Sequence, residues 1–317
     1  MSRMALHPMP SASALGTLCQ AVVRRWPEHE PYLRQRFGEA GADNAATAEL
    51  LAERILRICG HDLAKVVDDY RWTCGVMLEE EYHFRRHGRY RHTSFEEVRQ
   101  LVYDNPDYMR RYAHGLLLSQ LLWANHCRAM QAYHESFLSR LPRDATLLEV
   151  GPGHGLLLAL AAERLTEARI TGWDVSDTSL EATRGALTAM RTRNVDLRRQ
   201  DLLTAPTDQM FDAVVASELV EHLEHPTEAL RRLTALTRPG GLLFLNIPVN
   251  SPAPDHLALW RSPEALRSLV TDVGLTIEQS HEFPMTGKTV QQARSQNLTI
   301  SCVLLCRRPT DERPGHA

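Results

Sequence analysis

The hydrophobic pattern changes its period near residue 142. Before that point, apolar residues recur every three or four positions with charges between them, as in the stretch 44–88, and this spacing predicts amphipathic helices. A break is predicted at "HGRYRHTS" (87–94). New helices are predicted after Ser94 and at Asn105-Pro106, because these residues suit a helix start, and the second helical pattern continues to residue 142.

After residue 142, short apolar runs such as "TLLEV", "ARITGWDV" and "FDAVVAS" alternate with helical segments. A repeated order of strand, helix and strand predicts an α/β fold, with a doubly wound, mostly parallel sheet and helices on both faces. The chain therefore divides into a helical N-terminal region (1–141), an α/β domain (142–309) and a polar, flexible tail (310–317).

Composition narrows the class of protein. The chain has 317 residues and a net charge of −3, so a broad nucleic-acid surface is not expected. The first 30 residues have no apolar segment of the signal-peptide type, and no uncharged stretch approaches the roughly 18 residues of a membrane span. The six cysteines form no CxxC pair. A cytoplasmic protein with free thiols and no membrane partner is predicted.

The segment "LLEVGPGHGLLL" (147–158) carries the main chemical signal. Gly151, Gly153 and Gly155 follow an apolar run, and Glu149 stands two residues before the first glycine. No Gly-Lys-Ser/Thr sequence follows, which excludes a P-loop, and the spacing differs from the GxGxxG of dinucleotide-binding loops. Because ligands of doubly wound sheets bind beyond the carboxyl ends of the strands, this loop is expected to hold one.

These residues resemble motif I of the class I S-adenosylmethionine-dependent methyltransferases, and the resemblance extends from about Asp144 to Arg307. It implies a seven-stranded Rossmann-like methyltransferase sheet, an N-terminal helical region that covers the substrate as a lid, and S-adenosyl-L-methionine as cofactor. The cofactor-binding residues that it implies are Glu149, Gly151, Gly153, Gly155, Asp174, Val175, Asp201, Leu202, Ser217 and Glu218.

Each acid at a strand end has an implied role. Glu149 would orient the ammonium group of the cofactor while the glycine backbone closes over its methionyl part. Asp174 would accept hydrogen bonds from the ribose hydroxyls, and Asp201, with Leu202 beside it, would face the adenine. Ser217 and Glu218 would lie beside the sulfonium. A helix N-cap, a surface acid or a solvated turn residue is the alternative interpretation of any one of these acids alone.

Candidates for the chemistry of transfer lie in two places. His256 stands in the Pro-containing segment "NIPVNSPAPDHLALW" (246–260) and could act as a general base or bind a carboxylate. Tyr108, Tyr112 and His126 share one face of the predicted helix before the sheet with Ser119, Trp123 and Met130. Packing in the core is the alternative role for this stripe.

The run "SELVEHLEHP" (217–226) places Glu218, Glu221 and His222 around one helical turn. This spacing resembles the metal site of ubiquinone-pathway O-methyltransferases and of small-RNA 2′-O-methyltransferases. Glu-His pairs also follow the fourth strand in metal-free relatives, where the histidine packs locally. The expectation is therefore that no metal is bound and that activity survives a chelator.

The resemblance implies an S-adenosylmethionine-dependent methyltransferase of small-molecule biosynthesis. A carboxylate-bearing acceptor is preferred: an amino or hydroxy acid, or a methionine-like thioether, methylated on sulfur or oxygen. The alternatives are a lyase or cyclase that uses the sulfonium without methyl transfer, a metal-assisted O-methyltransferase of a catechol-like or quinone-precursor substrate, and a non-catalytic binding partner. A homodimer is left open.

Overall fold

The computed structural model describes residues 13–38 and 44–310, and the predicted flexible tail lies outside this range except for its first residue. Its centre is one seven-stranded sheet in the order β3-β2-β1-β4-β5-β7-β6. The sequence prediction of a seven-stranded α/β sheet is confirmed. The strands are β1 (Thr146–Val150), β2 (Arg169–Asp174), β3 (Val195–Arg199), β4 (Phe211–Ser217), β5 (Thr237–Val249), β6 (Thr276–Pro284) and β7 (Ile300–Arg307).

Five neighbouring strands run parallel, from β3 to β5, and β7 is antiparallel to both β5 and β6. The carboxyl ends of β1, β2 and β4 therefore meet at one edge of the sheet. The glycine loop (151–155) leaves β1 at this edge, as the sequence predicts.

Successive residues of each strand point to opposite faces, and the two faces have separate cores. Leu147 packs in a cluster with α8 (Leu156–Arg164) and α9 (Asp177–Ala189), whereas Leu148 packs in a cluster with α10 (Pro226–Leu236) and α11 (Pro263–Asp272). Because both faces of the central strands are covered, these strands read as continuous apolar runs rather than alternating ones.

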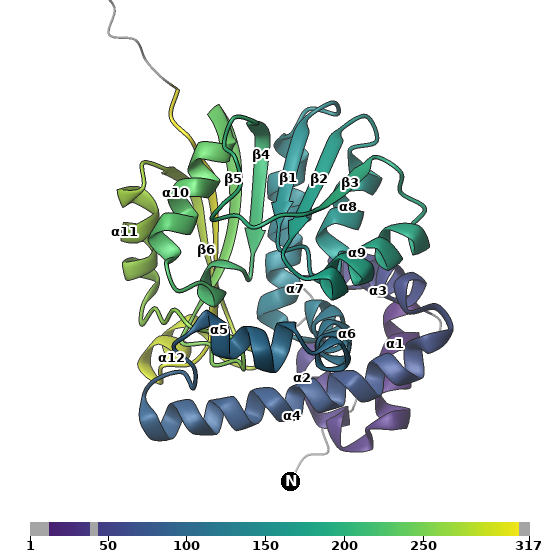
Figure 1. Ribbon diagram of the computed structural model, residues 1–317. Coiled ribbons are helices and arrows are strands. Elements are labelled where there is room, and N and C mark those ends of the chain that lie inside the picture. Colours follow the sequence, from purple (N-terminus) through teal and green to yellow (C-terminus); the bar gives the residue numbers. More distant parts are fainter. Residues whose placement is uncertain (1–12, 39–43, 311–317) are drawn as a thin grey trace, which may run out of the picture.

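The N-terminal helices lie on two sides of the sheet: α4, α5 and α6 cross the carboxyl edge of the strands, whereas α7 packs on one face next to β6 and β7 (Figure 1). They are α1 (Ala14–Arg25), α2 (Glu30–Phe37), α3 (Ala45–Cys59), α4 (Leu63–His87), α5 (Phe95–Val98), a π-helical segment (Arg99–Tyr103), α6 (Pro106–Leu122), α7 (Ala124–Gln131) and a second π-helical segment (Ala132–Phe137).

The predicted helix boundaries hold at three positions and fail at one. Helix α4 ends at Gly88 with a φ of +68°, α5 follows Ser94, and the side chain of Asn105 caps α6 by accepting a hydrogen bond from the Tyr108 amide. The prediction of one helical run from there to residue 142 is wrong, because the backbone is extended at Trp123. The Trp123 indole donates to the buried Tyr70 hydroxyl (3.1 Å), a tertiary contact that no local pattern encodes.

The hydrophobic core crosses the predicted division at 141/142. Tyr133 and Phe137 pack against Phe244 of β5, with ring centroids 5.1 and 5.5 Å apart, and all three side chains are buried. The Tyr133 hydroxyl donates to the backbone carbonyl of Leu157 in α8. The division therefore marks a change in sequence pattern, while one continuous core joins the helices to the sheet.

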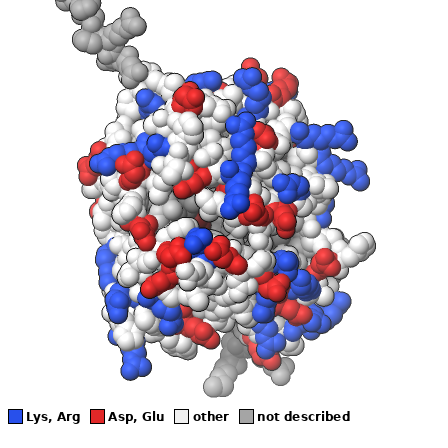
Figure 2. All heavy atoms as spheres, in the orientation of Figure 1, with Lys and Arg blue, Asp and Glu red and all other residues white. Residues whose placement is uncertain are grey.

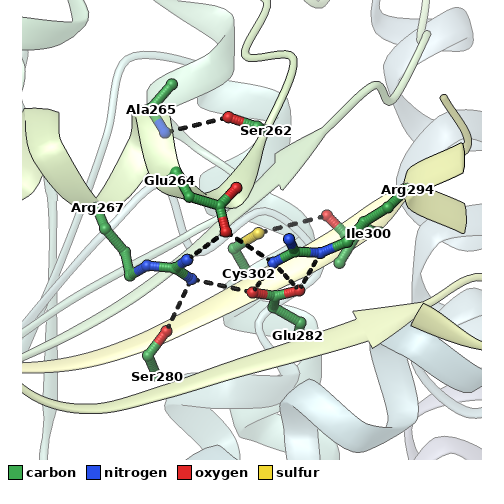
Figure 3. A network of polar contacts seen from close by, with 9 residues as sticks. All are labelled: Ser262, Glu264, Ala265, Arg267, Ser280, Glu282, Arg294, Ile300 and Cys302. Carbon is green, nitrogen blue, oxygen red and sulfur yellow. Dashed lines mark hydrogen bonds and ion pairs between the residues drawn. The ribbon is translucent and has the colours of Figure 1, made fainter. Parts of the chain in front are cut away.

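A surface network fastens the last part of the sheet (Figure 3). Arg294 of α12 (Val290–Ser295) pairs with Glu282 of β6 (2.6 Å) and with Glu264 of α11 (2.9 Å). Arg267 joins the same two carboxylates at 3.0 and 2.7 Å. The network holds α12 against both β6 and α11.

All six cysteines lie in described positions as free thiols, which confirms the sequence prediction. Across residues 13–38 and 44–310, no helix is both long and apolar enough to cross a membrane.

Candidate functional site

A cavity of about 880 Å³ lies between the carboxyl edge of the sheet and the helical layer. Its floor comes from the ends of β1, β2 and β4 and the loops that follow them. Its roof comes from α4, α5, α6 and the first π-helical segment, with side chains that include Met77, Phe95, Tyr103, Met109 and Leu116. Its position at the topological edge and its size fit a ligand site.

The three glycines of the loop all have positive φ, between +52° and +78°, but the space around their Cα atoms differs. A Cβ on Gly151 would lie 2.9 Å from Cδ1 of Leu219, so this position is tight. A Cβ on Gly153 would meet only the carbonyl oxygen of Gly151, at 4.0 Å, because it would point into open space. Both line the cavity.

Gly155 does not line the cavity, which corrects its predicted role as a cofactor-binding residue. It precedes α8 as N-cap, and a Cβ there would lie 2.7 Å from Cα of Thr183. Its lack of a side chain therefore lets the loop approach α9.

Glu149 is a buried carboxyl group at the end of β1, with 2% of its surface exposed. Burial, together with the nearby Asp174, raises its pKa to about 8. Among the described residues, its Oε2 atom has no hydrogen-bond partner. A buried acceptor of this kind is compensated by a positively charged ligand group, and an ammonium group fits.

Asp174 ends β2 and also faces the cavity. Its Oδ1 accepts from the amide of Ser176 at 2.9 Å. Burial raises its pKa to about 6, although backbone amides, first that of Ser176, act in the opposite direction. Val175 beside it is exposed and lines the same cavity. The helix N-cap here is Ser176, so the alternative role of Asp174 as that cap does not apply.

Asp201 and Leu202 line the cavity after β3. Asp201 is exposed, and its Oδ1 accepts from the amide of Leu203 (2.8 Å), whereas Leu202 is 5% exposed and packs in the core of the α10 face. The hydrogen bond from the Leu203 amide therefore occupies one carboxylate oxygen of Asp201.

Ser217 and Glu218 line the cavity at the end of β4, next to Asn246 of β5. The Asn246 side chain donates to the Ser217 hydroxyl (3.2 Å) and to Oε1 of Glu218 (2.9 Å). Glu218 has a φ of +51°, a backbone conformation that a residue with a side chain rarely adopts. Burial raises its pKa to about 8.

Nine of the ten predicted cofactor-binding residues thus line one cavity, in the order expected for the ammonium, ribose and adenine ends of S-adenosylmethionine. The unpartnered Glu149 oxygen and the open space at Gly153 fit this cofactor. Its net positive charge also suits the acids that surround it.

The structure separates the predicted catalytic residues. His256, Tyr112 and His126 line the cavity and are buried, whereas Tyr108 does not line it and packs edge-on against Trp72. Burial lowers the pKa of His256 and of His126 to about 3, so both imidazoles are neutral at neutral pH.

The remaining residues of the predicted stripe have mixed roles. The Ser119 hydroxyl contacts Nδ1 of His126 at 3.0 Å, and Trp123 lines the cavity beside it. Met130 packs in the core, as the alternative interpretation of the stripe had it.

Tyr103 was not selected from the sequence, and Asp255 stood out there only as a polar residue of the 246–260 segment, without a role of its own. Asp255 is 2% exposed and accepts hydrogen bonds from the Tyr103 and Tyr112 hydroxyls, at 3.2 and 3.0 Å. Its Oδ2 lies 3.3 Å from Nδ1 of His222. The Asp-His pair in the 246–260 segment was a usable signal for Asp255, but a π-helical turn positions Tyr103, and no spacing rule predicts that turn.

Three potential metal ligands converge beside Glu218. Donor atoms of Glu221, His222 and His256 lie within 4.8 Å of one another. Sequence spacing joined Glu221 and His222 with Glu218, and the structure adds His256 from a separate loop.

Most of the charged side chains that line the cavity are acidic. Arg85 is the one Arg or Lys among the described residues that line it, and this side chain is paired with Glu81 at 2.6 Å. The acidic lining residues are Glu81, Glu149, Asp174, Asp201, Glu218, Glu224 and Asp255. On the face of the molecule that Figure 2 shows, Lys and Arg side chains are interspersed with Asp and Glu side chains. This face therefore carries no broad basic patch.

Comparison with known proteins agrees with this geometry. The sequence profile of the methyltransferase domain matches residues 122–280, half of the chain. The chain is 36% identical to a trans-aconitate 2-methyltransferase of Azoarcus sp. (strain BH72) over 128 residues, which are 40% of this chain and 49% of the relative. It is 35% identical to a ubiquinone biosynthesis O-methyltransferase of Xanthomonas axonopodis pv. citri (strain 306) over 121 residues, 37% of this chain and 49% of the relative.

The chain thus spans about half the length of these curated relatives. Among solved structures, mitomycin 7-O-methyltransferase is similar in fold, with a TM-score of 0.52 at 15% identity, over 78% of this chain and 70% of that one. The chain belongs to the methyltransferase-domain family, the class I S-adenosylmethionine-dependent methyltransferases, whose cofactor is S-adenosylmethionine.

Proposed function

We propose that the chain transfers the methyl group of S-adenosylmethionine to a small-molecule acceptor held in the same cavity. The observation that carries the proposal is that one cavity of about 880 Å³ is lined both by the residues that suit the cofactor and by apolar side chains of the helical layer. A cofactor and a small acceptor can therefore lie in contact and away from water.

S-adenosylmethionine supplies an electrophilic methyl group on its sulfonium. The chain has three tasks around it. Glu149 and Asp174 bind the ammonium group and the ribose of the cofactor, Glu218 and Ser217 present oxygen atoms beside the sulfonium, and the roof side chains exclude water. Alignment and desolvation of this kind supply much of the acceleration in a two-reactant displacement.

The apolar side chains under the helical layer favour a neutral, largely apolar acceptor that carries a hydroxyl group. Met77, Phe95, Met109 and Leu116 offer apolar contact there, while the nearby ionisable groups are mainly acids. A carboxylate-bearing acceptor is the second candidate. Arg85 at the cavity favours it, as does the name of the Azoarcus relative, a trans-aconitate methyltransferase.

An acceptor screen with methyl-labelled cofactor tests the proposal. Neutral phenols and matched carboxylates are compared at equal concentration, and the nucleoside product is identified. S-adenosylhomocysteine together with a labelled acceptor supports methyl transfer. Methylthioadenosine without a labelled acceptor would instead indicate a lyase or cyclase.

Replacing Asp174 by alanine is expected to weaken S-adenosylhomocysteine binding by about 1.5–3 kcal/mol, because a half-buried carboxylate that accepts ribose hydrogen bonds is lost. This corresponds to roughly 10- to 150-fold in Kd by calorimetry. Asp177→Ala is the matched control, since Asp177 is mostly exposed at the start of α9 and does not line the cavity. Equal affinity of the two variants would remove Asp174 from the cofactor site.

Cofactor binding is expected to release protons at pH 7. In the free chain, Glu149 has a pKa of about 8 and is mostly protonated there. An ammonium group placed beside it favours the ionised form, so the proton leaves and affinity rises with pH up to about 8. Below pH 6, protonation of Asp174 weakens binding further.

Calorimetry of S-adenosylhomocysteine binding at pH 7, in buffers of different ionisation enthalpy, measures this release. The Glu149→Gln variant keeps the shape of the side chain and is expected to lose most of the release. A binding enthalpy that does not depend on the buffer in the unaltered chain would contradict the role given to Glu149.

A further inference from the structure

We propose that one end of the cavity binds the part of the acceptor farthest from its methylated hydroxyl, and that this end takes an uncharged carboxamide group. We call this end the distal arm; its lining residues are His29, Tyr32, Cys74, Trp123, Asn125 and Thr286. The proposal rests on the proposed function, because it names a chemical class for the acceptor held in the same cavity.

The cavity extends beyond the length that the cofactor needs. Asp201 lines it after β3, and Thr299 lines it directly before β7, whose first residue pairs with the last residue of β5. In the order β3-β2-β1-β4-β5-β7 these two ends are five steps apart, which is about 24 Å at about 4.8 Å a step. The cofactor is assigned to the first three steps, which end at β4. The other two steps, about 10 Å, leave room for an acceptor longer than one aromatic ring.

A break between two helices shapes the distal arm. Helix α6 ends just before Trp123, whose backbone is extended (φ −93°, ψ 130°), and α7 begins just after it. Thr286, in the loop after β6, accepts from the Ala124 amide (2.9 Å) and contacts the Tyr32 hydroxyl (2.8 Å). The Trp123 indole donates to Tyr70 of α4. Three parts of the chain, α2, α4 and the loop after β6, therefore fix the break in place.

The distal arm is uncharged at neutral pH. Burial raises the pKa of the Cys74 thiol and of the Tyr32 hydroxyl to about 12, and burial lowers the pKa of the His29 imidazole to about 4. Arg36 lies near Tyr32 but does not line the cavity. A carboxylate bound in the arm would lose its hydration without a cation in contact, which is costly.

His29 offers a hydrogen-bond donor. Two parallel rings stack on its imidazole, Trp26 at 4.0 Å and Tyr32 at 4.6 Å between centroids, so only the ring edge is open to a ligand. Its Nε2 lies 3.1 Å from the hydroxyl of Tyr70, which is fully buried and already accepts from the Trp123 indole. The hydroxyl hydrogen of Tyr70 needs an acceptor, and Nε2 of His29 supplies it. In the neutral ring the proton is then on Nδ1, which has no hydrogen-bond partner within the described residues.

Asn125 offers the matching acceptor. It lies in the first turn of α7, is 3% exposed and lines the cavity. Its side-chain nitrogen donates to the Ser301 hydroxyl of β7 at 3.0 Å. Its Oδ1 has no partner in the part of the chain that the structure describes. An amide oxygen in so enclosed a place is stabilised when a ligand donates a hydrogen bond to it.

A carboxamide satisfies both groups at once. One chain of contacts joins them, from His29 to Tyr70 and from Tyr70 to Trp123, which stands two residues before Asn125. The carbonyl oxygen of the ligand would accept from Nδ1 of His29, and its N–H would donate to Oδ1 of Asn125. A carboxylate has no donor for Asn125, and an unsubstituted ring leaves both protein groups unpaired. The distal arm therefore distinguishes a carboxamide from both.

Three bicyclic probes, each with one hydroxyl group, test this preference: 2-naphthol, 6-hydroxy-2-naphthamide and 6-hydroxy-2-naphthoate. Calorimetry at pH 7 measures their Kd on the full-length chain saturated with S-adenosylhomocysteine. The amide is expected to bind at least about tenfold more tightly than either of the other two, because only the amide pairs with both polar groups of the arm.

Two substitutions assign the preference to the distal arm. His29→Phe keeps a stacked ring without the N–H donor, and Asn125→Leu removes the amide oxygen. Each is expected to weaken binding of the amide by roughly 5- to 100-fold, and to bring the ratio of the 2-naphthol and amide Kd values toward one. His61→Phe, at an exposed position outside the cavity, is the matched control and should keep the full ratio. Because the ratio is measured within one variant, partial loss of folded protein does not change it.

Four results would overturn the proposal: a ratio near one in the unaltered chain, tighter binding of the naphthoate than of the amide, no binding of any of the three probes, or a ratio that His29→Phe and Asn125→Leu both leave unchanged. These results would leave the proposed function intact, because the screen with labelled cofactor tests methyl transfer separately.

Discussion

A Gly153→Val substitution is expected to abolish measurable S-adenosylhomocysteine binding. The side chain would project into the open space of the cavity, where the backbone of the loop is proposed to meet the cofactor. The valine also adopts a φ near +52°, where a β-branched residue is strained by about 1–2 kcal/mol. Calorimetry measures the affinity, and thermal unfolding measures the separate cost to stability.

Gly60→Val separates strain from obstruction. Gly60 has a φ of +51°, is exposed, and has open space around its Cβ position, but it lies outside the cavity. It should lose stability through backbone strain, since its ψ of −123° also lies outside the left-handed helical region, and it should keep full affinity for S-adenosylhomocysteine. If Gly153→Val also binds normally while folded, the loop does not contact the cofactor.

A chain that begins at Leu141 is expected to lose its native fold, and with it all cofactor binding. The sequence pattern alone suggests the opposite, because the glycine loop and the strand-end acids all follow that point. In the structure, however, Tyr133 and Phe137 fill the space beside Phe244, and their removal would expose the core around β5. Near-ultraviolet circular dichroism and calorimetry of the fragment measure the loss.

A single substitution checks the same point in the full-length chain. Phe137→Ala is expected to lower the free energy of unfolding by about 3–5 kcal/mol, as for other buried aromatic residues. Leu101→Ala, at a side chain that is 55% exposed, should change it by less than about 0.5 kcal/mol. A stable, cofactor-binding fragment from Leu141 would show that the helices form a separable lid.

Much of the cofactor site could be predicted because its signals are local. Each acid or glycine directly follows an apolar strand, and parallel strands bring their carboxyl ends to one edge. That rule places Glu149, Asp174 and Asp201 around one cavity without further information. It does not distinguish Gly153, which faces the cavity, from Gly155, which packs against α9, because both have the same spacing and a positive φ.

The other half of the site depends on contacts between distant segments. His256 reaches Glu221 through two backbone hydrogen bonds between loops, and Asp255 joins tyrosines from two helical segments. Periodicity gave Tyr108 and Tyr112 the same face, but Tyr108 packs against Trp72 of α4, whereas Tyr112 reaches the cavity and donates to Asp255. Tertiary contacts of this kind cannot be predicted from the spacing of residues along the sequence.

The shared core also limits how acceptor specificity can change in this protein. If the N-terminal helices of another methyltransferase replaced those of this chain, they would have to supply new packing partners for Phe244 as well as a new roof for the cavity. Changes of acceptor are therefore more readily made by exchanging single roof residues, such as Met77, Phe95 or Leu116, than by recombining whole segments. A designer of altered substrate range would accordingly choose point-mutant libraries on α4, α5 and α6 over chimeras.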